Sequence, residues 1–112
     1  MCTFHIIFIG ACNGIDFKKK CEESGTICEA VFVTNGATCD AHCQSLGLTC
    51  EDAWDEKGDE CRKKTTGVWR VGNRCGISDC DDPDDCDDDQ ICRCATGKGK
   101  SIITIHIFVD NL

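Results

Sequence analysis

The sequence lacks tyrosine altogether, and it has one proline, one methionine, five phenylalanines and two tryptophans among 112 residues. With so few aromatic side chains, the hydrophobic core is small for the length of the chain. Domains with a small core usually depend on disulfides or a bound metal. The sequence also lacks an apolar run of the roughly 18 residues that a membrane-spanning helix needs. We therefore expect a single domain that does not span a membrane.

Positive charge is the scarcer sign, with 12 Lys and Arg against 20 Asp and Glu and a formal net charge of −8. Eight of the acidic residues lie in the segment 79–89, so the 12 others balance the 12 basic residues. The chain has no basic stripe that could follow a phosphate backbone. Nucleic acid is therefore excluded as a partner.

Catalytic motifs are scarce as well. The sequence has no Gly-x-Ser-x-Gly, His-Glu-x-x-His or phosphate-binding loop. A catalytic cysteine needs a free thiolate beside a base, and we expect nearly all cysteines here to be oxidised. One cluster of acidic residues could supply an acid pair, although a solvated turn explains it more simply: Glu51, Asp52, Asp55, Glu56, Asp59 and Glu60. We predict that the chain is not an enzyme, and we assign His42 to the surface.

Cysteine, by contrast, is in excess: 13 residues, about 12% of the chain, a level typical of disulfide scaffolds. Disulfides at this density persist in oxidising compartments, so we expect a secreted or extracellular protein. The alternative is a zinc cluster, for which Cys39 and Cys43 have a suitable spacing, while His5, His42 and His106 are widely scattered. Twelve cysteines are predicted to form five or six disulfides: Cys12, Cys21, Cys28, Cys39, Cys43, Cys50, Cys61, Cys75, Cys80, Cys86, Cys92 and Cys94.

The cysteines also define the predicted domain. Residues 1–11 have the apolar stretch and small final residues of a short signal peptide, with an ordinary first strand as the alternative. Cleavage between Ala11 and Cys12 would leave an even number of cysteines, whereas an odd count leaves a thiol for an intermolecular disulfide. Residues 12–95 are the disulfide-rich domain, and residues 96–112 are a linker and an apolar tail.

The clearest local signal predicts one short helix at about 38–47. Thr38 can cap it by accepting a backbone N–H, and Gly47 suits a left-handed C-terminal stop. Cys39 and Cys43 share one face at i, i+4 spacing and lie too far apart to pair with each other. A two-turn helix is unstable alone, so its order depends on two bridges to other parts of the chain.

Several short strands are expected around this helix, which gives a small disulfide-rich fold. The expected strands are 30–34, 48–54, 65–71, 90–95 and 102–109. Asn35-Gly36 predicts a tight turn with positive φ. Two segments are expected to be solvated: the polar stretch 15–28 and a turn at 55–59. The last strand either joins the domain or remains an adhesive tail.

Three side chains of these strands carry further expectations. Trp54 is the expected hydrophobic anchor. Cys92 and Cys94 are assigned to opposite faces of their strand, and therefore to two different bridges.

The first cysteine spacings resemble those of a known family. From Cys12 to Cys50 the gaps between successive cysteines are 8, 6, 10, 3 and 6 residues. This pattern resembles the frizzled-type cysteine-rich domain and is carried by Cys12, Cys21, Cys28, Cys39, Cys43 and Cys50. The resemblance implies an ectodomain that binds a lipid or a protein, and it assigns no binding residues.

The acidic segment predicts a metal site. The run from Cys80 to Asp89 partly resembles the calcium-binding end of an LDL-receptor class A repeat, with Asp81, Asp85 and Asp88 on the acidic positions of that motif. Its crowded carboxylates repel one another, and calcium, which takes six to eight oxygen ligands, relieves this repulsion. The alternatives are a solvated acidic face and a docking site for a basic partner. No other cofactor is expected.

These features favour one class of function. We expect a secreted, non-enzymatic binding or assembly module whose ligand is an extracellular protein or a lipid, with calcium dependence through the acidic segment. The alternative is a secreted defensive or venom-type effector or a protease inhibitor.

Overall fold

A computed structural model describes residues 2–8, 10–57, 60–70, 72–78, 89–97 and 103–109, and it gives only the backbone in strands β1 and β7 and at Lys57. The elements in chain order are β1 (Cys2–Phe8), β2 (Lys19–Glu23), β3 (Ile27–Val33), α1 (Cys39–Ser45), β4 (Thr49–Lys57), β5 (Glu60–Lys64), the 3-10 turns η1 (Gly67–Arg70) and η2 (Arg74–Gly76), β6 (Asp89–Ala95) and β7 (Ile103–Val109). The predicted class, a small disulfide-rich fold with one helix and several short strands, is confirmed.

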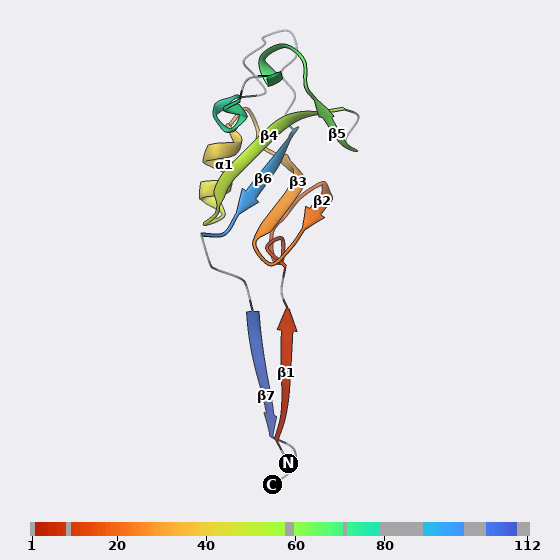
Figure 1. The fold of residues 1–112 in the computed structure, drawn as a ribbon, viewed down its shortest axis with the longest axis vertical. Helices are drawn as coiled ribbons and strands as arrows, with labels where there is room; N and C mark the ends of the chain where they lie inside the picture. Colours follow the sequence, from red (N-terminus) through yellow and green to blue (C-terminus); the bar gives the residue numbers. More distant parts are fainter. Residues whose placement is uncertain are drawn as a thin grey trace.

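The strands form two separate sheets. Five of them form an antiparallel sheet in the order β2-β3-β6-β4-β5, with β6 at its centre. The other two, β1 and β7, pair only with each other and project from one end of the five-stranded sheet, so the molecule measures 65 × 26 × 20 Å (Figure 1). The last predicted strand therefore pairs with β1 and does not join the main sheet.

Helix α1 covers one side of the five-stranded sheet, which we call the helix face (Figure 1). The side chains buried between helix and sheet are small or sulfur-containing, apart from Phe32: Ala11, Cys12, Cys28, Ala30, Phe32, Cys39, Cys43, Ala53, Cys92 and Cys94. Two disulfides, Cys39–Cys92 and Cys43–Cys94, run directly from α1 to β6. Sulfur bridges thus supply much of the core that the sparse aromatic residues do not.

These two disulfides correct one expectation. Cys92 and Cys94 do serve different bridges, but they lie on the same face of β6, both fully buried under α1. The physical reason is the period of two of a β-strand, which returns residue i+2 to the side of residue i. The distance between Cys92 and Cys94, two residues apart on the strand, therefore matches the distance between Cys39 and Cys43, four residues apart on the helix. The two bridges lie side by side for this reason.

The predicted signals at both ends of α1 are confirmed. The Thr38 hydroxyl accepts the Ala41 N–H at 3.1 Å. Gly47 has φ of +75°, its N–H donates to the Gln44 carbonyl, and the Leu48 N–H donates to the Cys43 carbonyl. This pair of bonds is the Schellman stop that a glycine in this position permits.

The turn before the helix also has its predicted form. Asn35 and Gly36 have φ of +51° and +84°. The Ala37 N–H donates to the Thr34 carbonyl at 3.0 Å and closes the turn. The chain therefore reverses sharply between β3 and α1, which brings Cys39 over the sheet.

The opposite side of the sheet, the concave face, is curled. A flat sheet would hold β2 and β5 roughly 19 Å apart, four times the usual strand spacing. Instead, the Cys21–Cys61 disulfide joins these two edge strands with their Cα atoms 5.6 Å apart. Val31, Trp54 and Ile91 fill the space inside the curl with Cys21 packed against them. Trp54, 8% exposed, is thus the anchor of this face, as predicted.

Two other expectations about local structure are wrong, and a third is incomplete. Residues 55–57 continue β4 and do not begin a turn, because they pair with β5, a strand that had not been predicted. The segment 65–71 contains the 3-10 turn η1, since Gly67 has φ of +61° and breaks the extended pattern. The segment 15–28 is largely solvent-exposed, as expected, but it is not irregular throughout, since it contains β2 and the start of β3.

Candidate functional site

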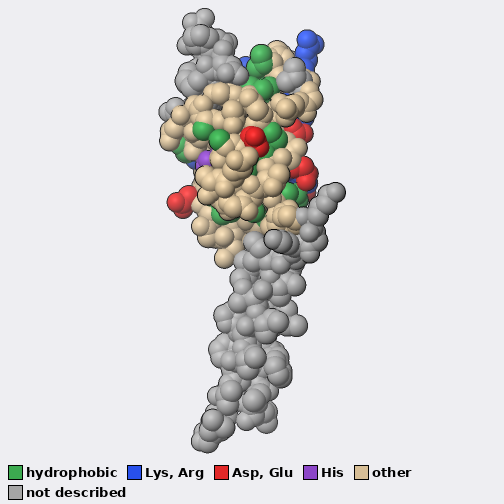
Figure 2. Space-filling view, turned by 90° about the vertical axis from the view of Figure 1, so that its left-hand side faces the viewer, with side chains coloured by type: hydrophobic (Ala, Val, Ile, Leu, Met, Phe, Trp, Pro, Cys, Tyr) green, Lys and Arg blue, Asp and Glu red, His purple; other side chains and the backbone are tan. Residues whose placement is uncertain are grey.

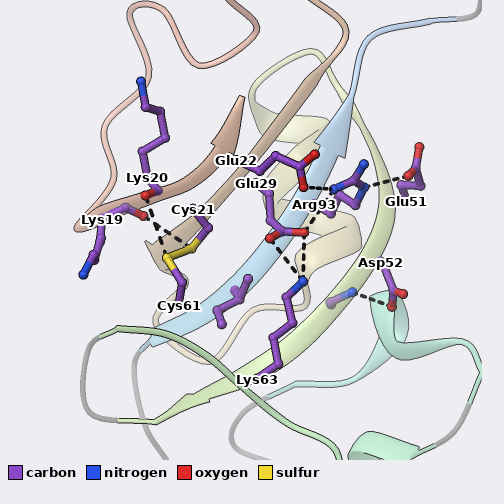
Figure 3. Close-up of polar contacts among 12 residues, drawn as sticks. Lys19, Lys20, Cys21, Glu22, Glu29, Glu51, Asp52, Cys61, Lys63 and Arg93 are labelled. Atoms are coloured by element: carbon purple, nitrogen blue, oxygen red, sulfur yellow. Dashed lines mark hydrogen bonds and ion pairs between the residues drawn. A yellow bond between two sulfur atoms is a disulfide. The ribbon is translucent and has the colours of Figure 1, made fainter. Parts of the chain in front are cut away.

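A ladder of ion pairs crosses the concave face. Arg93 of β6 donates to Glu51 of β4 at 2.7 Å, to Glu22 of β2 at 2.9 Å and to Glu29 of β3 at 3.2 Å. These contacts raise the pKa of Arg93, the Glu51 hydrogen bond most of all. Lys63 of β5 lies 3.2 Å from Glu29. The ladder therefore links all five strands through side chains alone (Figure 3).

The same ladder covers Trp54. The Lys63 ammonium lies 3.9 Å from the centre of the Trp54 ring, and the Arg74 guanidinium lies 5.1 Å from it. Arg74 also donates twice to Asp52, at 3.0 and 2.9 Å. Cations over an indole face are attracted by the ring quadrupole. Ion pairs and cation–π contacts therefore cover the apolar residues of the concave face.

A cavity lies at the end of the sheet nearest the turn at Asn35. Its volume is about 260 Å³, and we call it the Phe17 groove after one of its five lining residues: Asp16, Phe17, Lys18, Val33 and His42. The first three precede β2, Val33 ends β3, and His42 lies in α1. Lys18 is fixed by its backbone N–H, which donates to Val31, and by an ion pair with Asp89.

His42 is the titratable group of this groove. Its ring lies 4.8 Å from the Phe32 ring, centre to centre, and its Nε2 atom is buried without a hydrogen-bond partner in the part of the chain that the structure describes. Burial lowers the pKa of His42, because the charged imidazolium would lose solvation. The expectation of a surface histidine is therefore wrong: His42 is half-buried, and its neutral form is favoured.

The Glu23 carboxylate holds the chain in place where the disulfide-rich domain begins, at Cys12. Glu23 accepts the Cys12 N–H at 2.9 Å and pairs with Lys20 at 3.0 Å. The Lys20 contact, followed by the Cys12 N–H, lowers the pKa of Glu23. Its carboxylate lies 2.2 Å from where a Cβ on Gly10 would stand, so a glycine there leaves room for Glu23 to reach the backbone.

Ten of the twelve predicted disulfide cysteines are bridged. The bridges are Cys12–Cys28, Cys21–Cys61, Cys39–Cys92, Cys43–Cys94 and Cys50–Cys75. Cys80 and Cys86 lie outside the described residues, as do the predicted calcium ligands Asp81, Asp85 and Asp88. Within the described residues no group of three or more His, Cys, Asp or Glu side chains could hold a metal ion.

The acidic cluster of residues 51–60 forms ion pairs where the structure describes it. Glu51 pairs with Arg93, Asp52 with Arg74, and Asp55 with Lys64. Glu56 is buried at 8% exposure, and Asp59 lies outside the described residues. The sequence did not single out the Phe17 groove, although Phe17, an aromatic residue in the mainly polar stretch 15–28, was the available signal.

The described surface on the α1 side carries small, separated groups of hydrophobic and charged side chains (Figure 2). Among the described residues, no helix is long and apolar enough to cross a membrane. Comparisons of the chain with models of protein families, with curated proteins and with solved structures find no match.

Proposed function

We propose that the chain is a secreted, non-enzymatic binding or assembly module of the extracellular space. The observation that carries this proposal is the covalent framework: five disulfides fasten the helix, both edges of the sheet and its centre. Such bridges persist where the environment is oxidising. The scaffold they hold rigid presents the Phe17 groove, which binds the ligand.

The test of compartment is a thiol count on the protein isolated from its natural source. Intact mass is measured before and after reduction, with alkylation of free thiols. We expect at least ten cysteines to be oxidised, and a mass of two chains that reduction converts to one would identify an intermolecular disulfide. Thirteen reduced thiols with bound metal would overturn the proposal.

Calcium dependence belongs to the same proposal and is supported by the density of carboxylates in the sequence 79–89. Extracellular calcium modules bind at about 10⁻⁴–10⁻³ M, and a ligand that binds only the folded state raises the melting temperature. We expect a higher Tm in millimolar calcium than in EDTA. A variant with Asp81, Asp85 and Asp88 changed to Asn should lose this difference, and equal Tm values for the parent chain would remove calcium from the proposal.

A further inference from the structure

We propose that the ribbon of β1 and β7 docks face to face on the same ribbon of a second copy of this chain. This inference rests on the proposed assembly function and names the partner. It follows from the register of the two strands, from the position of the ribbon at one end of the five-stranded sheet and from the area that two ribbons would bury.

The register divides the ribbon into two unlike faces. Successive residues of a strand lie on opposite faces, and residues directly opposite on antiparallel strands share a face. One face, which we call the apolar face, therefore holds four register pairs without a polar or charged residue: Cys2–Val109, Phe4–Ile107, Ile6–Ile105 and Phe8–Ile103. The other face holds three pairs in which four of six residues are polar: Thr3–Phe108, His5–His106 and Ile7–Thr104. This pattern is typical of an antiparallel sheet with one face in water and one face covered.

The five-stranded sheet does not cover the apolar face. Within the described residues, β1 and β7 pair only with each other, and they project from one end of that sheet (Figure 1). A two-stranded ribbon alone is marginally stable in water, and packing against a further layer stabilises it. The apolar face therefore calls for a layer from outside the described part of the chain.

A second copy of the ribbon supplies a matching layer. Seven of the eight residues on the apolar face are Phe, Ile or Val, and full burial of one such residue removes roughly 60–120 Å² from water. Two copies would together bury about 800–1,700 Å², and specific, stable interfaces bury about 1,200–2,000 Å². Because both copies present the same face, a two-fold axis closes the assembly as a dimer.

A lipid surface is the other candidate to cover an apolar face, and the open edges of the ribbon disfavour it. In the ranges that the structure describes, each strand of the ribbon pairs along one side only. Backbone N–H and C=O groups on the open side need hydrogen-bond partners, which the hydrocarbon interior of a bilayer lacks. In a face-to-face dimer these edges remain in water. The ribbon therefore favours a second copy over a lipid.

The dimer requires that residues 1–11 remain as a first strand and are not removed as a signal peptide. All seven residues of β1 have a register partner in β7, which favours this alternative. A chain cut between Ala11 and Cys12 would lack one of the two strands of the ribbon.

The test is the oligomeric state of the full, oxidised chain, measured by sedimentation equilibrium over a range of concentrations. We expect a reversible equilibrium between one chain and two. Ile6→Lys, on the apolar face, should raise the dissociation constant at least about tenfold, because burial of an unpaired charge is costly. Ile7→Lys, the same change at the adjacent position on the other face, should alter it less than about twofold, because surface substitutions have small effects.

A second pair of variants covers the case in which lysine disturbs the ribbon itself. Threonine is common in strands, so Ile6→Thr and Ile7→Thr retain the strand and change one face each. Ile6→Thr should weaken the dimer several-fold, and Ile7→Thr should leave it unchanged. Amide spectra establish that the five-stranded sheet of each variant is folded before its dissociation constant is compared.

Four outcomes would overturn the inference. A chain that stays monomeric, or a dimer that Ile7→Lys weakens as much as Ile6→Lys does, would remove the apolar face as the interface. Binding of the monomer to phosphatidylcholine vesicles that Ile6→Lys abolishes would make a lipid the occupant. An intact mass showing that the natural chain begins at Cys12 would remove β1. Each of these outcomes is compatible with ten oxidised cysteines, so the inference can fail while the proposed function stands.

Discussion

The two faces of the five-stranded sheet are stabilised by different chemistry. On the helix face, two buried disulfides fasten α1 to β6 among alanines and other cysteines. On the concave face, one partly exposed disulfide joins the sheet edges, and Trp54 lies beneath a ladder of ion pairs. A chain with few aromatic residues can thus build one side of its sheet from sulfur and the other from charge. The two sides should respond differently to substitution, pH and salt.

The largest effect is expected on removing both bridges of the helix face. Loop entropy gives about 4 kcal/mol for Cys21–Cys61, whose sequence separation is 40. For Cys39–Cys92 it gives only about 2 kcal/mol while Cys43–Cys94 is intact, because the two bridges then close a ring of four helix residues and two strand residues. Changing all four of these fully buried cysteines to Ala removes both bridges, and it should therefore cost more unfolding free energy than changing Cys21 and Cys61 to Ala.

Denaturant unfolding without reductant measures this difference. The Cys21 and Cys61 variant is the comparison, since it removes a bridge at a more exposed site on the other face. A larger loss for the exposed bridge would reverse the ranking of the two faces.

Trp54→Ala should disrupt the packing on the concave face and lower the free energy of unfolding. Removing a buried tryptophan typically costs about 3–5 kcal/mol, and here Lys63 would also lose the ring it covers. Val68→Ala, at a 52% exposed position, should change stability by less than about 0.5 kcal/mol. Thermal unfolding of both variants checks the prediction, and a loss below about 1 kcal/mol for Trp54→Ala would contradict it.

Arg93→Gln should have an intermediate effect. It leaves Glu29, which is 3% exposed, with Lys63 as its remaining cationic partner, and we expect a loss of about 1–3 kcal/mol. Arg62→Gln is the matched control, because Arg62 pairs with Glu60 at an exposed site, where ion pairs contribute about 0–1 kcal/mol. Equal losses in urea unfolding would show that the ladder is no stronger than a surface pair.

The smallest effect is expected from His42 in the Phe17 groove, as a weak dependence of folding stability on pH. The pKa of His42 is below its ordinary value of 6.5 in the folded chain, so the unfolded chain binds more protons just below pH 6.5. Stability should therefore be constant above that pH with respect to this group, and it should fall as the pH drops through the lowered pKa. His42→Gln should flatten the slope that begins just below pH 6.5. An unchanged slope in Tm against pH would show that His42 is not the cause.

Local signals predicted the parts of the fold that depend on neighbouring residues. The helix, its Thr38 cap, its Gly47 stop and the Asn35-Gly36 turn all follow from conformational preferences within a few residues. Strand β5 could not be predicted in this way. Its sequence has no apolar alternation, and it is a strand because β4 pairs with it and Cys61 bonds to Cys21.

The groove could not be predicted for a related reason. Its lining comes from three separate stretches, around Phe17, Val33 and His42, which meet only after the chain turns at Asn35 and the disulfides fix α1. The stretch before β2 is polar, and polarity alone predicted a solvated surface.

The bridges also set how the domain would carry a mechanical load applied at Cys12 and Cys94. Force passes from Cys12 through sulfur to Cys28, along 11 residues to Cys39, through sulfur to Cys92 and along two residues to Cys94. Thirteen residues extend to about 45 Å, whereas the 82 from Cys12 to Cys94 would extend to about 280 Å without the bridges. The Cys43–Cys94 bridge adds a parallel route through residues 40–43, so residues 44–91, which include Val68, Trp54 and the acidic segment, lie off the load path. Under tension, the domain would therefore extend only a short distance, and most of its residues would bear no force.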